Sequence, residues 1–499
     1  MLGKNIFANY ICQAYVALLG IIILPTYITY MGTETYGLIG FFTLLQAWFG
    51  LLDLGLTPTI SRETARYYSG RLRALQFRKL YRALSIIFVA ISMFSGSLLL
   101  GVSEQIATNW LTFDSLDTKD VIFSVQVMII GVSFRWMGGL YKGVITGAEL
   151  IVWLSVFNVL VASFRFLGVF VSMFLFGFTA KVFFIHQLVV IILELMMLYI
   201  KCYSCLPRKS SLNENIGWSI KPILSVLKFS LIIAFTSSIW ILVTQTDKLI
   251  LSGILSLTEY GFFSLAVLVA SAVLVSSAPV STALMPRLVR LWSDGEKQEF
   301  IRTYRGATQL VSIISGSVAF TFAFSAESLL FAWTGDRQIA IEVAPILRLY
   351  AIGNGFLVLA AFPYYLQYAL GNLKYHFIGN AIVAATLVPS IIYVAQEFGA
   401  IGAAWVWLSL NVTMFVFWVW YVHNKLFPTL HSKWIVNDVA YVLAPIFIFS
   451  MIFSALDISF SGRFSSFLSV LVFGSICLVL STVFSSQARK IIENRFLNG

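Results

Sequence analysis

Charged residues are scarce in this chain. Only 11% of its 499 residues are charged, whereas soluble domains carry roughly 25%. In contrast, 59% of the residues are hydrophobic and the mean hydropathy is +0.89. An apolar fraction this large cannot be hidden inside a water-soluble core, so many apolar side chains must face lipid. The composition therefore predicts an integral, all-α membrane protein.

Residues that build metal and catalytic sites are also few. Among the four cysteines, Cys202 and Cys205 form one CxxC pair. A structural zinc site needs about four ligands, and neither a second pair nor a nearby histidine supplies them. The four histidines are dispersed, and the chain has no GxxxxGK[ST] loop for the phosphates of ATP. We therefore expect no enzyme activity, no metal and no bound cofactor.

The positive charges are unevenly distributed. A formal net charge of +11 could indicate nucleic-acid binding. However, Lys and Arg gather in alternate loops, as they do on the cytoplasmic side of membrane proteins. Two of these loops hold Arg62, Arg66, Arg71, Arg73, Arg78, Lys79 and Arg82, and Arg287, Arg290, Lys297, Arg302 and Arg305. The pattern predicts that both termini are cytoplasmic, and we expect no nucleic-acid partner.

Long apolar blocks predict about fourteen membrane-spanning helices, since one crossing needs about 20 mainly apolar residues. The first block, 6–30, is too long for the apolar region of a signal peptide and lacks a cleavage site, so we expect it to remain as a helix. Other predicted spans are 229–253 and the closely spaced pair 377–397 and 402–423. An even number of spans places both termini on one side, in agreement with the charges.

The chain also repeats itself. Tyr36-Gly37 recurs as Tyr260-Gly261 at an offset of 224 positions. The same offset relates Arg66 to Arg290, Arg78 to Arg302, and Gly147 to Gly371. A duplicated set of membrane helices is typical of transporters, because two similar halves can rock about a shared central site.

The repeat and the loops predict four parts. The expected division is an N-terminal six-helix lobe at 1–200, a cytoplasmic linker at 201–228, a C-terminal six-helix lobe at 229–424, and two additional spans with a cytoplasmic tail at 425–499. The linker contains Pro207 and Pro222, which favour an irregular segment.

Three short motifs carry a family resemblance. They are LDLG at 52–55, DKLILSG at 247–253 and GAIGAA at 399–404. With these motifs in order, the chain resembles, over nearly its whole length, the Wzx-type O-antigen flippases of the multidrug/oligosaccharidyl-lipid/polysaccharide (MOP) exporter superfamily. The resemblance implies two six-helix pseudo-repeats in a V-shaped bundle, followed by two extra helices.

The resemblance also implies a function. Such proteins move an undecaprenyl-diphosphate-linked oligosaccharide from the inner to the outer leaflet of the bacterial cytoplasmic (inner) membrane by alternating access. The implied partners are the lipid-linked oligosaccharide, the bilayer, and a polysaccharide polymerase and chain-length regulator. The resemblance does not identify the glycan or its pathway.

A diphosphate needs cationic side chains inside the membrane, where each charge is costly and therefore a functional candidate. Arg165 is the strongest, because it lies about 21 Å into its predicted helix and its planar fork suits phosphate oxygens. Arg135, Lys248 and Arg348 lie closer to helix ends and either line the site or reach the interface. For Arg165 the alternative is a structural ion pair. Lys142 is interpreted as an ordinary residue of the positive-inside pattern.

Three acids within the predicted spans are candidates for ion coupling: Asp247, Asp53 and Glu194. A buried carboxylate can take up a proton or help to bind sodium, so any of them could couple transport to a proton or sodium gradient. The alternative is that Asp247 or Glu194 neutralises a nearby cation.

Other functions remain open from the sequence. A drug or metabolite exporter of the same superfamily would need a smaller and more acidic cavity, and twelve helices would suffice. A lipid II flippase would need the same chemistry as the polysaccharide exporter. A membrane glycan polymerase or acyltransferase would need a sizeable outer loop or an embedded His/Asp site, and the sequence shows neither.

Overall fold

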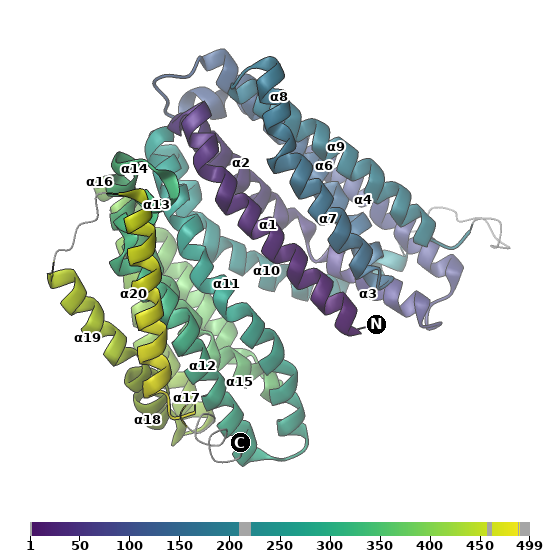
Figure 1. Ribbon diagram of the computed structural model, residues 1–499. Coiled ribbons are helices and arrows are strands. Elements are labelled where there is room, and N and C mark those ends of the chain that lie inside the picture. Colours follow the sequence, from purple (N-terminus) through teal and green to yellow (C-terminus); the bar gives the residue numbers. More distant parts are fainter. Residues whose placement is uncertain (1, 209–220, 457–461, 488, 490–499) are drawn as a thin grey trace. The chain divides into compact units, whose positions relative to one another are not determined.

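The chain is helical wherever it forms regular secondary structure in the described part. The computed structural model describes residues 2–208, 221–456, 462–487 and 489, and the elements within them are helices (Figure 1). Strand-like pairing in this part is limited to an isolated bridge between Thr112 and Ser256. Lipid offers no partners for backbone polar groups, so the chain satisfies them within helices. Twelve described segments are long and apolar enough to span a membrane. The predicted all-α, multi-pass membrane protein is confirmed.

The chain packs into two compact units, Met1–Gly261 and Phe262–Gly499. The first unit contains α1 (Leu2–Met31), α2 (Thr33–Phe49), η1 (Gly50–Asp53), α3 (Leu56–Tyr68), α4 (Ala74–Gly101), α5 (Ser103–Gln105), η2 (Ile106–Trp110), α6 (Thr118–Gly147), α7 (Ile151–Phe166), α8 (Gly168–Phe176), α9 (Ala180–Cys205) and α10 (Lys221–Ile254). The predicted boundary at 201–228 stays a prediction, and 209–220 lie outside the described residues.

Helix α6 is the centre of the first unit and packs against α3, α4 and α9. Val121, Val125, Met128 and Val132 follow one another at helical spacing and are almost completely buried. Other apolar side chains of this unit lie on its surface: Phe174 of α8, for example, is 73% exposed. Apolar residues thus occupy both the interior and the surface, as expected of a bundle surrounded by lipid.

Three glycines one turn apart on α6 allow a close crossing with α3. A Cβ at Gly143 or Gly147 would overlap backbone or side-chain atoms of α3, including the carbonyl of Ser61, and one at Gly139 would press on Thr57. Small residues at this spacing let membrane helices approach closely. This face fixes the position of α6, which bears two of the cations discussed below.

The second unit contains most of α11 (Leu257–Ser293), which begins in the first unit, and the remaining helices. They are α12 (Lys297–Phe324), α13 (Ala326–Thr334), α14 (Arg337–Ala360), α15 (Phe362–Leu370), α16 (Lys374–Thr413), η4 (Met414–Trp418), α17 (Val419–Leu426), α18 (Leu430–Lys433), η5 (Trp434–Ala440), α19 (Tyr441–Ala455) and α20 (Arg463–Phe484). Helix α14 packs against α12, α13 and α16, and α12 also contacts α19 and α20. Helix α16 is broken at Gly399, whose φ of 55° and ψ of −141° are not helical, between the predicted spans 377–397 and 402–423.

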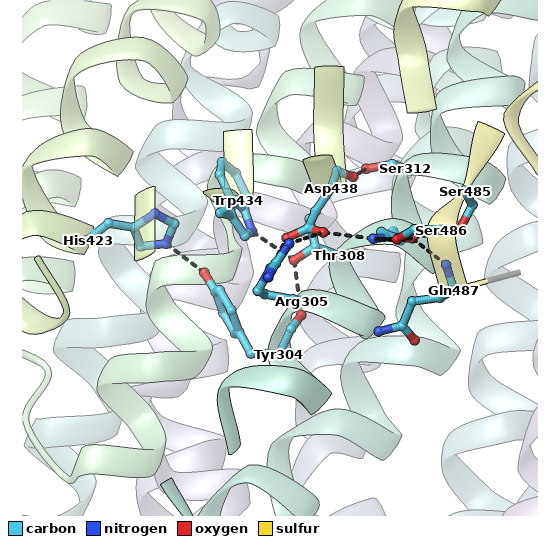
Figure 2. Close-up of polar contacts among 11 residues, drawn as sticks. Tyr304, Arg305, Thr308, Ser312, His423, Trp434, Asp438, Ser485, Ser486 and Gln487 are labelled. Atoms are coloured by element: carbon cyan, nitrogen blue, oxygen red, sulfur yellow. Dashed lines mark hydrogen bonds and ion pairs between the residues drawn. The ribbon is translucent and has the colours of Figure 1, made fainter. Parts of the chain in front are cut away.

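A buried polar network fastens α12 to the last helices (Figure 2). Arg305 binds both carboxylate oxygens of Asp438, through Nε at 2.5 Å and Nη2 at 3.1 Å, and Gln309 Nε2 donates to the same carboxylate at 2.7 Å. Gln309 Oε1 accepts hydrogen bonds from the Ser485 hydroxyl at 2.7 Å and the Gln487 backbone N–H at 3.1 Å, beyond the end of α20. Because Asp438 is fully buried, these partners are needed to offset the cost of its charge.

Candidate functional site

The first unit encloses a cavity of about 630 Å³ among α1, α2, α6, α7 and α9. This volume lies within the range of small-molecule sites, roughly 300–1,000 Å³. Its polar and charged lining residues are Gln13, Thr43, Gln46, Arg135, Lys142, Asn158, Arg165, Gln187 and Glu194. So many polar groups at membrane-spanning positions are costly, and they mark this cavity as the candidate functional site.

One carboxylate holds two cations in the cavity. Glu194 accepts from Lys142 Nζ at 2.7 Å and from Arg165 Nη2 at 2.8 Å, and only 6% of its side chain is exposed. Arg135 Nη1 donates to Gln46 Oε1. Three cationic side chains and one carboxylate give these lining residues a net charge of +2. The cavity therefore attracts anions even with Glu194 paired.

Two buried polar atoms beside this pair have no hydrogen-bond partner. They are Nε of Arg165 and Oε1 of Gln187. Buried polar groups in folded proteins are nearly always satisfied, so an unsatisfied donor on an arginine in a cavity is a specific place for a ligand oxygen or an ordered water.

A break between α7 and α8 positions Arg165. The break falls at Leu167, and the carbonyls in the last turn of α7 are taken up by side chains of neighbouring helices. The carbonyls of Phe164, Arg165 and Phe166 accept from His186 Nε2 at 2.9 Å, Gln187 Nε2 at 3.2 Å and Tyr27 OH at 2.9 Å, respectively. This satisfies backbone groups that lipid could not, and it holds the turn bearing Arg165 against α1 and α9.

The structure brings three of the predicted site residues together: Arg135, Arg165 and Glu194 all line this cavity. Lys142, which the sequence pattern had assigned to the ordinary positive-inside residues, lines it too. The signal for Lys142 was present, because seven residues separate it from Arg135 and two helical turns place both on one face of α6.

The other predicted residues of the first unit lie outside this cavity. Asp53 Oδ1 accepts from the Thr57 hydroxyl at 2.5 Å and from the Thr57 backbone N–H at 3.2 Å, where α3 begins. Asp247 is buried in α10 and accepts from the Lys248 backbone N–H at 2.8 Å. The ammonium of Lys248 donates to the Gln245 side chain at 3.0 Å.

Arg348 belongs to α14 of the second unit, and its side chain is exposed. Among the described residues, no group of three or more His, Cys, Asp or Glu side chains is placed to hold a metal ion.

Comparisons with known proteins agree with the membrane architecture. A family model described as "Polysaccharide biosynthesis protein" matches residues 2–292, more than half of the chain. A curated protein of Shigella flexneri, provisionally named an O-antigen transporter, is 22% identical over 391 residues, which cover 77% of this chain and 88% of that protein.

Solved structures show the same fold. Lipid II flippase MurJ in an inward closed conformation matches with a TM-score of 0.74 at 15% identity, covering 97% of this chain and 99% of that chain. An inward-facing MATE-family multidrug transporter of the MOP superfamily matches with a TM-score of 0.65 at 10% identity, covering 83% and 96%. These relatives are named as transporters or flippases, in line with the predicted transporter rather than an enzyme. The resemblance drawn from the motifs is confirmed: the chain belongs to the family described as polysaccharide biosynthesis protein, and it shares its fold with the lipid II flippase and with the MATE transporter of the MOP superfamily.

Proposed function

We propose that this protein moves an undecaprenyl-diphosphate-linked oligosaccharide, the repeat unit of an O-antigen or related surface polysaccharide, from the inner to the outer leaflet of the bacterial cytoplasmic membrane. The isoprenoid tail stays in lipid, while the diphosphate and sugars pass through a polar cavity. The family match and the relative named for O-antigen transport support this substrate class.

The observation that carries the proposal is the cationic cluster inside the spanning helices. Arg165, Arg135 and Lys142 face one cavity and outnumber its single carboxylate, Glu194. Guanidinium groups bind phosphate oxygens through paired, charge-assisted hydrogen bonds. Arg165 has a free Nε for such a bond, so a diphosphate could bind without first breaking every existing contact.

Glu194 gives the cluster two states. With Glu194 ionised, Lys142 and Arg165 are held by the carboxylate, as the 2.7 Å and 2.8 Å contacts show. A proton or a sodium ion on Glu194 would release both cations to the diphosphate. We therefore propose Glu194 as the coupling group at the cavity and retain Asp247 and Asp53 as further candidates. Lys248 and Arg348 remain candidates for contact with the substrate as it moves.

The proposed architecture has about fourteen crossings. Helix α10 has 34 residues and would add one to the twelve apolar segments. The segment Lys374–Leu426 has 53 residues, about 80 Å of helix, which exceeds one crossing of an approximately 30 Å core. Its break at Gly399 would make it two.

We further propose two six-helix lobes in a V-shaped bundle that work by alternating access. The parts are those predicted from the repeat: 1–200, the linker 201–228, 229–424, and the final pair with its tail at 425–499. The distribution of Lys and Arg supports cytoplasmic termini in the inner membrane. A polymerase and a chain-length regulator would act on the exported repeat units.

Replacing Arg165 tests the proposal. In a strain whose own exporter is deleted, Arg165→Ala at normal membrane abundance should reduce surface polysaccharide at least tenfold and leave lipid-linked oligosaccharide in the inner leaflet. The scale follows from losing charge-assisted hydrogen bonds of about 1.5–3 kcal/mol, since 1.4 kcal/mol is tenfold. Arg165→Lys should restore only part of the export, because a lysine keeps the charge without the fork.

The matched control is Arg71→Ala, which removes an exposed arginine outside the cavity and should leave export unchanged. Undiminished surface polysaccharide in Arg165→Ala would contradict the assigned role. Rescue of cell-wall synthesis instead would indicate a lipid II flippase, and resistance to cationic drugs would indicate a drug exporter.

A further inference from the structure

The second unit has a cavity of its own that the proposed transport does not use. It has a volume of about 760 Å³ and lies between α11, α12 and the residues that follow α20. Its size is that of a site for one small ligand. Most of its lining is apolar, and its charged side chains come from only three positions: Arg287, Glu299 and Arg302.

Two walls of this groove are formed by one face of α11 and one face of α12. Val280, Leu284 and Arg287 follow one face of α11, and Arg302, Gly306, Leu310 and Ile313 follow one face of α12. Arg287 lies six residues before the end of α11 and Arg302 five residues after the start of α12, so both lie about 8–9 Å from the turn that joins the helices. Arg287 and Arg302 thus lie at a similar level along their helices, at one end of the groove.

The third wall is formed by Ser485 and Gln487, which follow α20 and are held by contacts with α12. A Cβ on Gly306 would lie 2.6 Å from Gln487 Oε1, so the absence of a side chain at Gly306 makes room for Gln487. Gln309 then holds Gln487 and Ser485 through the hydrogen bonds of the buried network (Figure 2). The groove is therefore built by packing and hydrogen bonds and does not depend on an incidental gap between helices.

The polar end of the groove is cationic, and in the described part of the chain its two arginines are not held by strong ion pairs. Arg287 has no ion-pair partner among the residues the structure describes, and Arg302 meets Glu299 at 3.6 Å with both side chains largely exposed. An exposed pair of this kind contributes at most about 1 kcal/mol, so it competes weakly with a phosphate. The Thr303 hydroxyl lines the same end and can donate a further hydrogen bond.

The apolar part has the depth of one leaflet. Arg302 and Ile313 are eleven residues apart, about 16 Å along a helix. Half of a hydrocarbon core of roughly 30 Å is about 15 Å. A chain lying beside Leu310 and Ile313 would thus reach from headgroup level to the bilayer midplane.

We propose that this groove binds one anionic glycerophospholipid, with its phosphate between Arg287 and Arg302 and an acyl chain along Leu284, Leu310 and Ile313. Basic pockets between membrane helices on the cytoplasmic side bind anionic lipid headgroups. The leaflet rests on the orientation proposed above, which places the turn between α11 and α12 at the cytoplasmic surface. Binding itself rests only on the groove.

Native mass spectrometry of the purified full-length protein tests this. Delipidated protein is titrated with phosphatidylglycerol, phosphatidylethanolamine or undecaprenyl phosphate. The wild type should retain one phosphatidylglycerol at least tenfold more tightly than phosphatidylethanolamine, and Arg287→Gln combined with Arg302→Gln should abolish that preference. The matched control Arg290→Gln removes an exposed arginine of α11 outside the groove and should keep it.

A second variant addresses the tail. Leu310→Trp fills the apolar part of the groove without changing a charge, and Leu310 is 45% exposed, so the larger ring should be tolerated. It should reduce phosphatidylglycerol retention at least tenfold. Unchanged retention in either groove variant, or equal retention of phosphatidylethanolamine, would overturn the proposal. Displacement of phosphatidylglycerol by equimolar undecaprenyl phosphate would assign the groove to the transported lipid instead. Because the readout is lipid retention, a failure of the proposed transport would not affect it.

Discussion

Replacing Glu194 with glutamine separates the two roles that the structure gives this carboxylate. The change keeps the shape of the side chain but removes its charge, so Lys142 and Arg165 lose the partner they hold at 2.7 Å and 2.8 Å. Breaking a buried ion pair costs about 3–5 kcal/mol. The lower end applies here, because 32% of the Lys142 side chain is exposed and water stabilises it. We expect the empty protein to lose about 3 kcal/mol of stability.

Binding of an anion should change in the opposite direction. The cavity charge rises from +2 to +3, and one cation–anion contact at 4 Å is worth about 4 kcal/mol at an effective dielectric constant of 20. Glu194→Gln should therefore bind undecaprenyl diphosphate at least tenfold more tightly while exporting poorly. Thermal unfolding in detergent, without and with the lipid, measures the loss of stability and the gain in affinity. Equal stability and equal affinity in wild type and variant would refute the reasoning.

Two further substitutions test the scaffold around the sites. Gly143→Leu should abolish folded protein in the membrane, because the new side chain would overlap α3. A fluorescent fusion and the size-exclusion profile measure the amount of folded protein. The control Gly101→Leu should leave that amount unchanged, because a Cβ at Gly101 meets nothing within 4 Å. Arg305→Gln should lower the free energy of unfolding by about 3 kcal/mol, because it leaves Asp438 buried with an uncompensated charge. The control Arg290→Gln breaks an exposed ion pair and should change the free energy of unfolding by less than about 1 kcal/mol in the same assay. A Gly143→Leu protein that folds normally, or equal effects of the two arginine variants, would count against these packing arguments.

The helical membrane architecture could be predicted from the sequence because lipid leaves the chain few choices. Runs of apolar residues must become helices there, and the length of each run is set by the bilayer. The break at residue 399 was also predicted, because the predicted spans 377–397 and 402–423 lie on either side of it. Gly399 lies in a small-residue stretch, and its φ of 55° is one that glycine adopts without strain.

The site could be predicted only in part. Arg135, Arg165 and Glu194 were recognisable one by one, since intramembrane charges are rare. Their assembly was not, because 29 residues separate Arg165 from Glu194 and 52 separate Lys142 from it, and only the packing of α6, α7 and α9 brings them together. Gln46 and Gln187 carry no charge, so no sequence signal distinguishes them from packed amides.

The repeat does not guarantee equal roles for matching positions. Gly147 is helical and faces Ser61 at the crossing of α6 and α3, whereas its counterpart Gly371 ends α15 with a φ of 71° and meets nothing within 4 Å. Arg78 is buried and donates to the carbonyl of Pro207, while its counterpart Arg302 is exposed and lines the lipid groove. Residues that match at the offset of 224 positions thus lie in different surroundings.

The single carboxylate in the cavity is consistent with a carrier rather than a high-affinity receptor. Three cations without a counter-charge would bind a diphosphate tightly and release it slowly, because binding strong enough for capture must still be weak enough for departure. In the proposed transport cycle, Glu194 would meet this requirement by competing with the substrate for Lys142 and Arg165. In the proposed cycle the carboxylate takes the place of the departing substrate, so Lys142 and Arg165 regain an anionic partner. Release is then an exchange of one anion for another, which is why removal of the Glu194 charge should favour binding and hinder export together.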